Sequence, residues 1–501
     1  MDTLDVSTEH DMSLRRETRQ QYYRTRRLEA FAKVAEIPEL LSLIFIHSLP
    51  RNNFATPNSK KAPLKLSHVS QHWRNVALNT PWLWTTLRLC SRECSEEIAN
   101  RHIQILNHWL RFSGRCHLSF HLVYIRNKTA DVFVDSILRT ILNHADRCRH
   151  IDLQVPPQCE YPFLKWLEKG SHVLEFIRLS TLHIIRKVHE DISITMDLSK
   201  FSNLRSFDVD SRRLKLTWID VPTCLQKLTL LCRKFSLESC NSIAKTIKKV
   251  DVNFMESKNQ NILEVLAKCF PELESLEYYV CTPNFVPQRR IEFPHLRRFQ
   301  INSEGLESSG IYDSLYLPSL SSLHAALYFH SGTNWPHLAA LLRVSSPPLT
   351  RLRIYVNGLE EQSVIDILRT VPHLTNLAIT LAHMGRDTLV ALTLPSVGDA
   401  NTGYRPIVET GTLCPHLESL TLLPNVVDHR FPTNLALNMI ASRRCRPSDD
   451  KGLELQPWSI LNYCRIAVDD SNSLRSHPDM RKYLEDGLML DSSGRYRPFS
   501  S

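Results

Sequence analysis

A six-residue unit with the pattern LxxLxL recurs through most of this chain and restricts its fold more than any other feature. The clearest copies lie in the segments FSNLRSFDV, PTCLQKLTL, FPELESLEY, FPHLRRFQI, PPLTRLRI, VPHLTNLAI and CPHLESLTL. Less regular copies begin at Cys148, Leu174, Ile247 and Leu320. A unit that returns at a nearly fixed interval predicts an array of stacked supersecondary elements.

The first positions of these units fall at residues 148, 174, 204, 225, 247, 273, 296, 320, 349, 374 and 417. Most of the intervals lie at or close to the 20–29 residues of leucine-rich repeats. The last interval indicates either an insertion at about 383–412 or a degenerate copy around Leu389, Leu392 and Leu394. Both readings stay open at this stage.

Each unit is expected to form a short strand with positions 4 and 6 buried and positions 3, 5 and 7 exposed. The segments 131–146, 261–269, 335–344 and 361–370 have apolar residues at three- and four-residue spacing, which predicts helices between the strands. The predicted fold class is therefore α/β, with residues 89–425 forming a curved leucine-rich-repeat-like solenoid that has parallel strands inside and helices outside.

The composition argues against an enzyme. The chain of 501 residues has only 13 Gly, and it lacks the GxGxxG, GxxxxGK[ST], GxSxG and HExxH motifs. The triplet Pro-His-Leu places His295, His373 and His416 at the same position of three units, which predicts structural roles for them. We expect no catalytic residue, no metal site and no cofactor.

The 13 cysteines have irregular spacing and form no CxxC pair, so most are expected to be small buried thiols in a reducing compartment. No signal peptide is expected, because the sequence opens with acidic and polar residues, and the longest apolar run, residues 40–46, is too short to span a bilayer. We expect a cytoplasmic or nuclear protein, or one found in both, with no membrane partner.

Basic residues exceed acidic ones by 61 to 52, a net charge of +9 spread over a long chain. Residues 1–35 include a basic stretch, 14–33, that predicts an exposed helix or a flexible segment. A nucleic-acid binder that uses the Arg-rich residues 15–27 is a third, weaker hypothesis. Nucleic acid is otherwise not an expected partner.

Residues 36–88 have a different pattern, with three short amphipathic helices and little core of their own. Pro38 and Glu39 indicate the start of a helix, and Ser70 is a candidate N-cap for the helix QHWRNVAL. Residues 426–501 lose the repeat and are expected to form a C-terminal cap and a tail, with Arg443, Arg444 and Arg446 in a polar loop and a strand near 463–468.

The segments IPELLSLIF and PLKLSHVSQHWRNVALNTPWLW, in this order, resemble an F-box. The likeness is closest to the fungal F-box-like proteins that continue into leucine-rich repeats. Two departures stand out, since Ile37 replaces the usual Leu and the loop at residues 50–62 is long. The resemblance covers about residues 36–88 well, and beyond them it concerns architecture only.

The resemblance implies that this chain is a substrate-recognition subunit of a Skp–cullin–F-box type ubiquitin ligase. The F-box would dock a Skp-type adaptor and, through it, a cullin, while the repeats would bind an unknown substrate protein. Trp73 and Trp84 are either adaptor contacts or internal anchors. The implied adaptor-binding residues are Ile37, Pro38, Leu40, Leu41, Ile44, Leu64 and Val69.

Substrate contacts are expected at the outward positions of the concave strands. Among them, Arg351, Arg353 and Tyr355 form the most suggestive cluster, because Arg and Tyr often dominate interfaces. Further outward residues are Lys249, Asp251, Glu277, Tyr279, Arg298 and Gln300, of which Arg298 and Gln300 complete the candidate substrate site. The alternative function is a leucine-rich-repeat interaction scaffold without ligase association.

Overall fold

The computed structural model describes residues 21, 26, 33–50, 54–92, 95–124, 131–181, 191–237, 243–254, 262–280, 289–304, 309–381, 386–394, 413–424, 430–444 and 459–492. The chain divides into two compact units, residues 1–186 and 187–501. Most of the basic stretch 14–33 lies outside the described residues.

The first unit begins with the N-terminal block, defined here as residues 36–88. It contains helices α2 (Pro38–His47), α3 (Leu64–Ser67) and α4 (Gln71–Leu78) and the 3-10 turn η1 (Pro81–Trp84). Pro38 occupies the first turn of α2, where its missing N–H costs no hydrogen bond. The predicted cap of α4 is confirmed, since the Ser70 hydroxyl accepts a hydrogen bond from the Trp73 amide at 3.1 Å.

A parallel sheet follows in the same unit, with strands β1 (Thr86–Ser91), β2 (Leu118–Tyr124), β3 (Cys148–Val155) and β4 (Phe176–Thr181) in chain order. Helices α5 (Glu96–Phe112), α6 (Asp131–Leu142) and α7 (Glu160–Leu167) connect the strands. Parallel neighbours require such crossovers, which explains the alternation of strand and helix.

Aromatic packing joins the N-terminal block to this sheet. Trp84 is buried and packs against Trp109 of α5, with ring centroids 5.0 Å apart, while its indole N–H donates to the Ala77 carbonyl at 2.9 Å. Trp84 is therefore an internal anchor, one of the two roles predicted for it. The Ala55 carbonyl accepts a hydrogen bond from the Arg88 amide at 2.7 Å, so the block also covers the edge of β1.

The second unit contains a longer parallel sheet. Its strands are β5 (Ile192–Met196), β6 (Ser206–Trp218), β7 (Lys227–Leu237), β8 (Lys249–Phe254), β9 (Ser275–Val280), β11 (Arg298–Glu304), β13 (Ser322–Thr333), β14 (Arg351–Leu359), β15 (Asn376–Leu381), β16 (Ser419–Pro424), β17 (Tyr463–Ile466) and β18 (Met489–Asp491). From β6 onward each pairs with the next named here, and β5 pairs with β6. The short strands β10 (Ile291–Glu292) and β12 (Leu315–Tyr316) form a separate pair.

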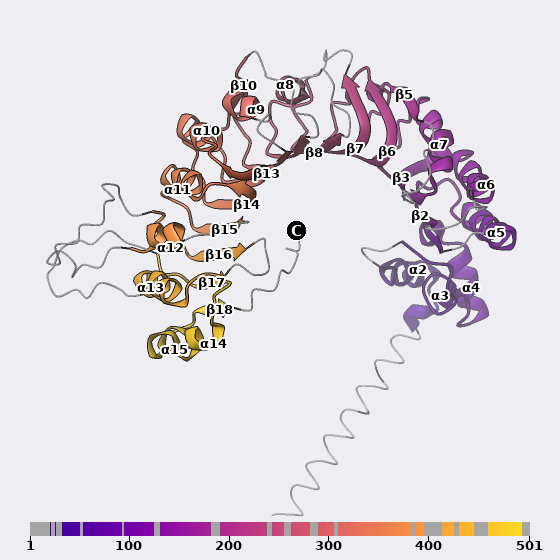
Figure 1. Cartoon of the computed structure of the whole chain (residues 1–501). Coiled ribbons are helices and arrows are strands. Elements are labelled where there is room, and N and C mark those ends of the chain that lie inside the picture. Colours follow the sequence, from indigo (N-terminus) through magenta and orange to yellow (C-terminus); the bar gives the residue numbers. More distant parts are fainter. Residues whose placement is uncertain are drawn as a thin grey trace, which may run out of the picture. The chain divides into compact units, whose positions relative to one another are not determined.

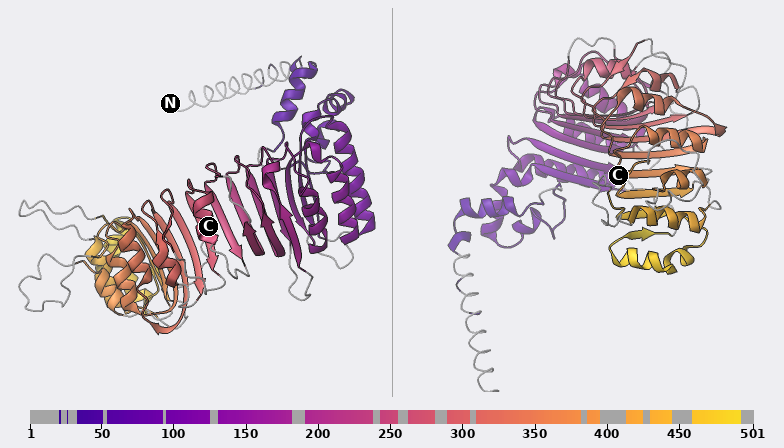
Figure 2. Two further views of the ribbon diagram at one scale, coloured as in Figure 1. Left: turned by 90° about the horizontal axis from the view of Figure 1, so that it is seen from above. Right: turned by 90° about the vertical axis from the view of Figure 1, so that its left-hand side faces the viewer.

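Helices cover one face of this second sheet. They are α8 (Ile262–Cys269), α9 (Ser309–Ser314), α10 (His337–Ser345), α11 (Glu361–Arg369), α12 (Arg386–Leu392), α13 (Thr433–Arg444), α14 (Ser471–Ser476) and α15 (Pro478–Glu485). Within this unit the strands line the concave side and the helices lie on the convex side (Figures 1 and 2). The predicted α/β class with parallel strands inside and helices outside is confirmed here.

The strand register explains the LxxLxL pattern. Positions 4 and 6 of successive units are hydrogen-bonded neighbours in the sheet, as with Phe299 beside Leu323 and Ile301 beside Ala325. All four of these side chains are buried. Position 1 is also buried in each copy from Leu204 to Leu417. Full burial of one Leu or Ile contributes about 1.5–3 kcal/mol, so the repeated pattern supplies a continuous core.

The wide interval between the last two units is an insertion and not an extra copy, because β15 and β16 pair directly. Leu389 and Leu392, the core of the alternative copy, lie buried on helix α12. The strand predicted near 463–468 is present as β17, but it extends the sheet. Strand–helix alternation thus continues past residue 425, where we expected only a cap.

Arg443 and Arg444 were expected in a polar loop, and that prediction is wrong. Both residues belong to the last turn of α13, and Arg443 is only 3% exposed. Its guanidinium is buried because backbone carbonyls satisfy its donors. Arg446 lies outside the described residues.

The cysteines of the described chain mostly fit the prediction of buried thiols. Eight are free, and burial raises the pKa of Cys148, Cys414 and Cys464 to about 12, which keeps them protonated. Cys269 differs, since it takes part in a disulfide.

Candidate functional site

Helix α2 leaves a large part of its apolar surface in solvent. Ile37, Leu40, Leu43 and Ile44 are between 37% and 53% exposed, and their spacing places them on one side of the helix. We call these four residues the α2 stripe. Leu41 and Phe45, on the opposite side, are fully buried, and Phe45 packs against Trp73 with ring centroids 4.9 Å apart.

The predicted adaptor-binding residues therefore divide into two groups. Ile37, Pro38, Leu40, Ile44 and Val69 are exposed. Leu41 was included in the predicted set, but its side chain is buried in the core of the block and presents no surface. Leu41 is buried together with Phe45, on the side of α2 that packs against Trp73 of α4.

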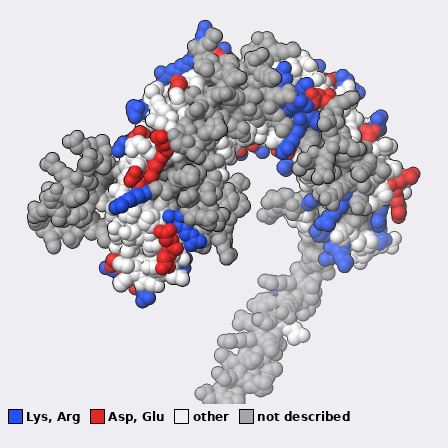
Figure 3. All heavy atoms as spheres, in the orientation of Figure 1, with Lys and Arg blue, Asp and Glu red and all other residues white. Residues whose placement is uncertain are grey.

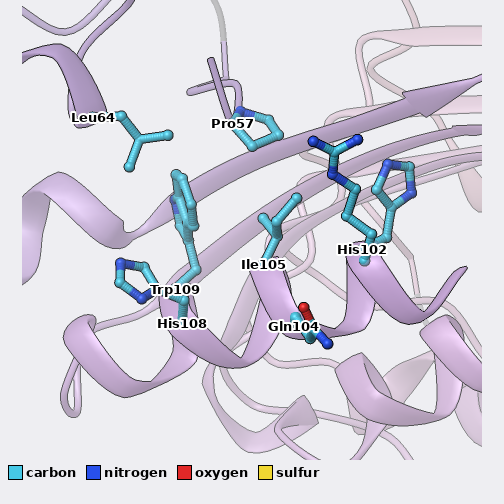
Figure 4. Close-up of a pocket in the computed structure, with 8 residues that line it drawn as sticks. Pro57, Leu64, His102, Gln104, Ile105, His108 and Trp109 are labelled. Atoms are coloured by element: carbon cyan, nitrogen blue, oxygen red, sulfur yellow. The ribbon is translucent and has the colours of Figure 1, made fainter. Parts of the chain in front are cut away.

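Leu64, the remaining predicted contact, lines a shallow groove of about 630 Å³ in the first unit. Figure 4 shows Leu64 and Pro57 on one side of this groove and Ile105, His108 and Trp109 of α5 on the other. Leu64 thus faces α5. Burial lowers the pKa of His108, with Arg111 adding to the effect, so this groove holds a neutral imidazole at neutral pH.

Two exposed apolar side chains were not singled out from the sequence. Leu43 belongs to the α2 stripe, and Trp82 in η1 is 61% exposed. The sequence could have indicated Leu43 as an exposed residue, because it lies three residues after Leu40 on a helix that is apolar on nearly every side. Such a helix is either fully buried or covered by a partner.

The predicted substrate residues lie together on the inner face of the second sheet. Arg351 is exposed, and Arg353 and Tyr355 are half-buried on the same face of β14. The Tyr355 ring lies 5.6 Å from that of Tyr328 on the neighbouring strand. Arg298 and Gln300 occupy the same face of β11, one strand beyond β13.

Acidic side chains occupy this face at β8 and β9. Asp251 is the register partner of Glu277, whose carboxylate accepts a hydrogen bond from the Gln300 amide at 2.7 Å. Burial, together with the neighbouring Glu277 carboxylate, raises the pKa of Asp251 to about 6, and Lys249 opposes this shift. Two carboxylates on adjacent strands repel each other when both are ionised.

Replacing Asp251 with asparagine should raise the thermal unfolding midpoint at pH 7.5. The folded pKa of about 6 lies above the ordinary Asp value of about 3.9, so the folded state binds the extra proton between these pH values. The contribution of Asp251 to the stability of the unaltered chain therefore falls as pH rises from 4 to 6, and the Asp251→Asn variant lacks this loss.

The comparison is a pair of melting curves at pH 4 and pH 7.5 for Asp251→Asn and for Asp387→Asn, an exposed Asp in α12. The advantage of Asp251→Asn should disappear at pH 4. An equal gain at both pH values, or the same pH-dependent gain in Asp387→Asn, would contradict the assignment.

In the view of Figure 3, basic and acidic side chains are interspersed over the described surface. The described residues contain no cluster of three or more His, Cys, Asp or Glu with the geometry of a metal site. Among the described helices, none combines the length and the apolar character needed to cross a bilayer.

The three histidines of the Pro-His-Leu triplets lie at equivalent turns before β11, β15 and β16. His373 and His416 stack, with ring centroids 6.2 Å apart, and His295 lies 3.9 Å from a Glu272 carboxylate oxygen. They recur with the repeat and do not converge on one site.

Comparison with known proteins gives no family: no family model matches the chain, and no curated protein matches it. The geometry described above therefore supplies the functional argument.

Proposed function

We propose that this chain is the substrate-recognition subunit of a Skp–cullin–F-box type ubiquitin ligase. In this proposal the N-terminal block docks a Skp-type adaptor, and through it a cullin, while the inner face of the second sheet binds a substrate protein. The chain itself performs no catalysis, because it acts by holding the substrate near a ubiquitin-charged enzyme.

The observation that carries this proposal is the α2 stripe. Four large aliphatic side chains on one side of a single helix are costly to leave in water, at about 25 cal/mol for each Å² of apolar surface. The stripe lies within the segment that resembles an F-box. An apolar helix face of this kind suits a hydrophobic groove on a partner.

A double substitution, Leu40→Asp with Leu43→Asp, tests adaptor docking. Both side chains are exposed, so the folded chain should tolerate the change, while two carboxylates in an apolar interface should abolish the complex. The measurement is co-expression with a Skp-type adaptor followed by size-exclusion chromatography. We expect co-elution for the unaltered chain and at least a hundredfold loss of affinity for the variant.

The matched control is Val132→Asp, which changes an even more exposed aliphatic residue of the same unit on helix α6. It should leave the complex intact. A folded chain that binds no adaptor, or a complex that survives Leu40→Asp with Leu43→Asp, would reject the docking surface.

The second candidate is an interaction scaffold without a ligase. It is supported by the hydrogen bond between Ala55 and Arg88 and by the packing of Trp84 on Trp109, because both let the N-terminal block cap the first sheet. A capping role needs no adaptor. Absence of adaptor binding in the experiment above would favour this candidate.

A further inference from the structure

One row of side chains on the inner face of the second sheet changes charge along its length. The row crosses the strands from β8 to β14, and its members are register partners. We call it the charge row; its residues are Asp251, Glu277, Gln300, His324 and Arg353.

The acidic end consists of Asp251 and Glu277 on adjacent strands. The Gln300 amide donates to Glu277 and so holds that carboxylate over the face of the sheet. A ligand cation placed between the two carboxylates would relieve their mutual repulsion.

The basic end consists of Arg353 and of Arg351, which lies two residues earlier on the same face of β14. The register partners of Arg351 are Ser322 and Asn376, which carry no charge. Between the two ends, His324 is neutral at pH 7, because burial and the nearby Arg353 lower its pKa to about 4. The centre of the charge row is therefore polar and uncharged.

The separation of the two ends sets the length of a matching ligand. From β9 to β14 there are three strand steps, through β11 and β13, and from β8 there are four. At about 4.8 Å for each step, the distances are about 14 and 19 Å. An extended chain rises about 3.3 Å per residue, so these distances span four to six residues.

We infer that the charge row binds an extended peptide segment that carries a Lys or Arg and an Asp or Glu four to six residues apart. The cation lies over Asp251 and Glu277, and the carboxylate lies over Arg351 and Arg353. Tyr279 and Tyr355, in the next row at the two ends, supply aromatic surface beside the segment. The inference rests on the proposed function only in assigning this segment to the substrate.

The test uses the full chain and fluorescent twelve-residue peptides of Ser and Ala in which one Lys and one Glu are separated by varied spacing. Fluorescence anisotropy should show the tightest binding at a separation of four to six residues. At that spacing, peptides with two Lys or two Glu should bind at least tenfold more weakly. Binding that ignores spacing, or a preference for the peptide with two Glu, would overturn the inference.

Charge reversal in the protein provides the control against misfolding. Asp251→Lys with Glu277→Lys should prefer the peptide with two Glu, and Arg351→Glu with Arg353→Glu should prefer the peptide with two Lys. An exchange of preference requires a folded site. If a variant loses all binding, circular dichroism and the single Arg353→Gln variant show whether the cause is misfolding or a loss of specific contacts.

Adaptor co-elution of the same variants separates this inference from the proposed function. Neither pair of substitutions touches the α2 stripe, so adaptor binding should persist in both. An adaptor complex without any Lys/Glu preference rejects the inference alone. A Lys/Glu preference without an adaptor complex rejects the ligase role and leaves the charge row as the binding site of a scaffold.

Discussion

Replacing Arg443 with methionine should destabilise the second unit by about 2–6 kcal/mol, because each buried acceptor left without a donor costs about 1–3 kcal/mol. The guanidinium donates to three backbone carbonyls, from Nε to Leu392 at 2.8 Å and from Nη1 and Nη2 to Cys414 and Leu413 at 2.9 Å each. Methionine has a similar length but no donor. The buried Leu392 and Leu413 carbonyls would then lose these hydrogen bonds, and the Cys414 carbonyl would keep only the one from the Leu417 amide at 3.4 Å.

The three carbonyls show why the loss should be large. Leu392 ends helix α12, and Leu413 and Cys414 form the turn that leads into β16. Arg443 thus connects three segments that lie far apart in the sequence. Burial lowers the pKa of Arg443 only to about 10, which leaves the side chain charged at neutral pH. Urea unfolding monitored by circular dichroism measures the loss, and hydrogen exchange should show it in α12 and α13.

Two further arginine substitutions serve as controls. Arg369→Met removes an exposed guanidinium that pairs with Asp366 and should change stability by less than about 0.5 kcal/mol. Arg443→Lys keeps the charge but loses the planar fork, so it should retain less than half of the stabilisation. An Arg443→Met variant as stable as Arg369→Met would show that the carbonyls find other donors.

The strands of the second sheet could be predicted from the sequence because the LxxLxL pattern follows burial. Every first position from Leu204 to Leu417 is buried, and positions 4 and 6 face the same core. Helices α8, α10 and α11 were also predicted to within two residues at each end, since their apolar residues follow the helical period. Helix α6 was predicted as 131–146 but ends at Leu142.

One strand that departs from the pattern was missed, and another was predicted but not recognised as a repeat unit. Strand β1 has Leu87 and Leu89 at the inward positions, but Trp84 stands where a leucine was expected. The unit that forms β17 has Leu461, Cys464 and Ile466, and its cysteine hides the pattern. A sequence search that accepted any apolar residue or cysteine at positions 1, 4 and 6 would have identified both repeat units.

The candidate site was harder to predict, because tertiary packing decides it. Helix α2 is apolar on nearly every side, so periodicity alone does not separate exposed Leu40 from buried Leu41. The outward residues of β14 were identified from the alternation of the strand. The charge row was not, because its order depends on which strands are neighbours and in what register.

Trp84→Ala should destabilise the first unit by about 3–5 kcal/mol, as large-to-small changes at buried aromatics do. Trp84 is 1% exposed, and its ring packs against both Trp109 and His108. The change leaves a cavity and removes one hydrogen bond from the Ala77 carbonyl, which keeps the bond from the Thr80 amide. Thermal unfolding of the full chain and hydrogen exchange of α4 and α5 measure the effect.

Trp82 provides a matched control within the same turn, since it is 61% exposed and lies only two residues earlier. Trp82→Ala should change stability by less than about 0.5 kcal/mol. Because Trp84 fixes the N-terminal block to helix α5, its loss should also weaken the proposed adaptor docking. The folded core should remain intact in Trp82→Ala. Equal destabilisation by the two substitutions would mean that the block is not anchored through Trp84, and the α2 stripe would then lack the rigid support that the proposed docking requires.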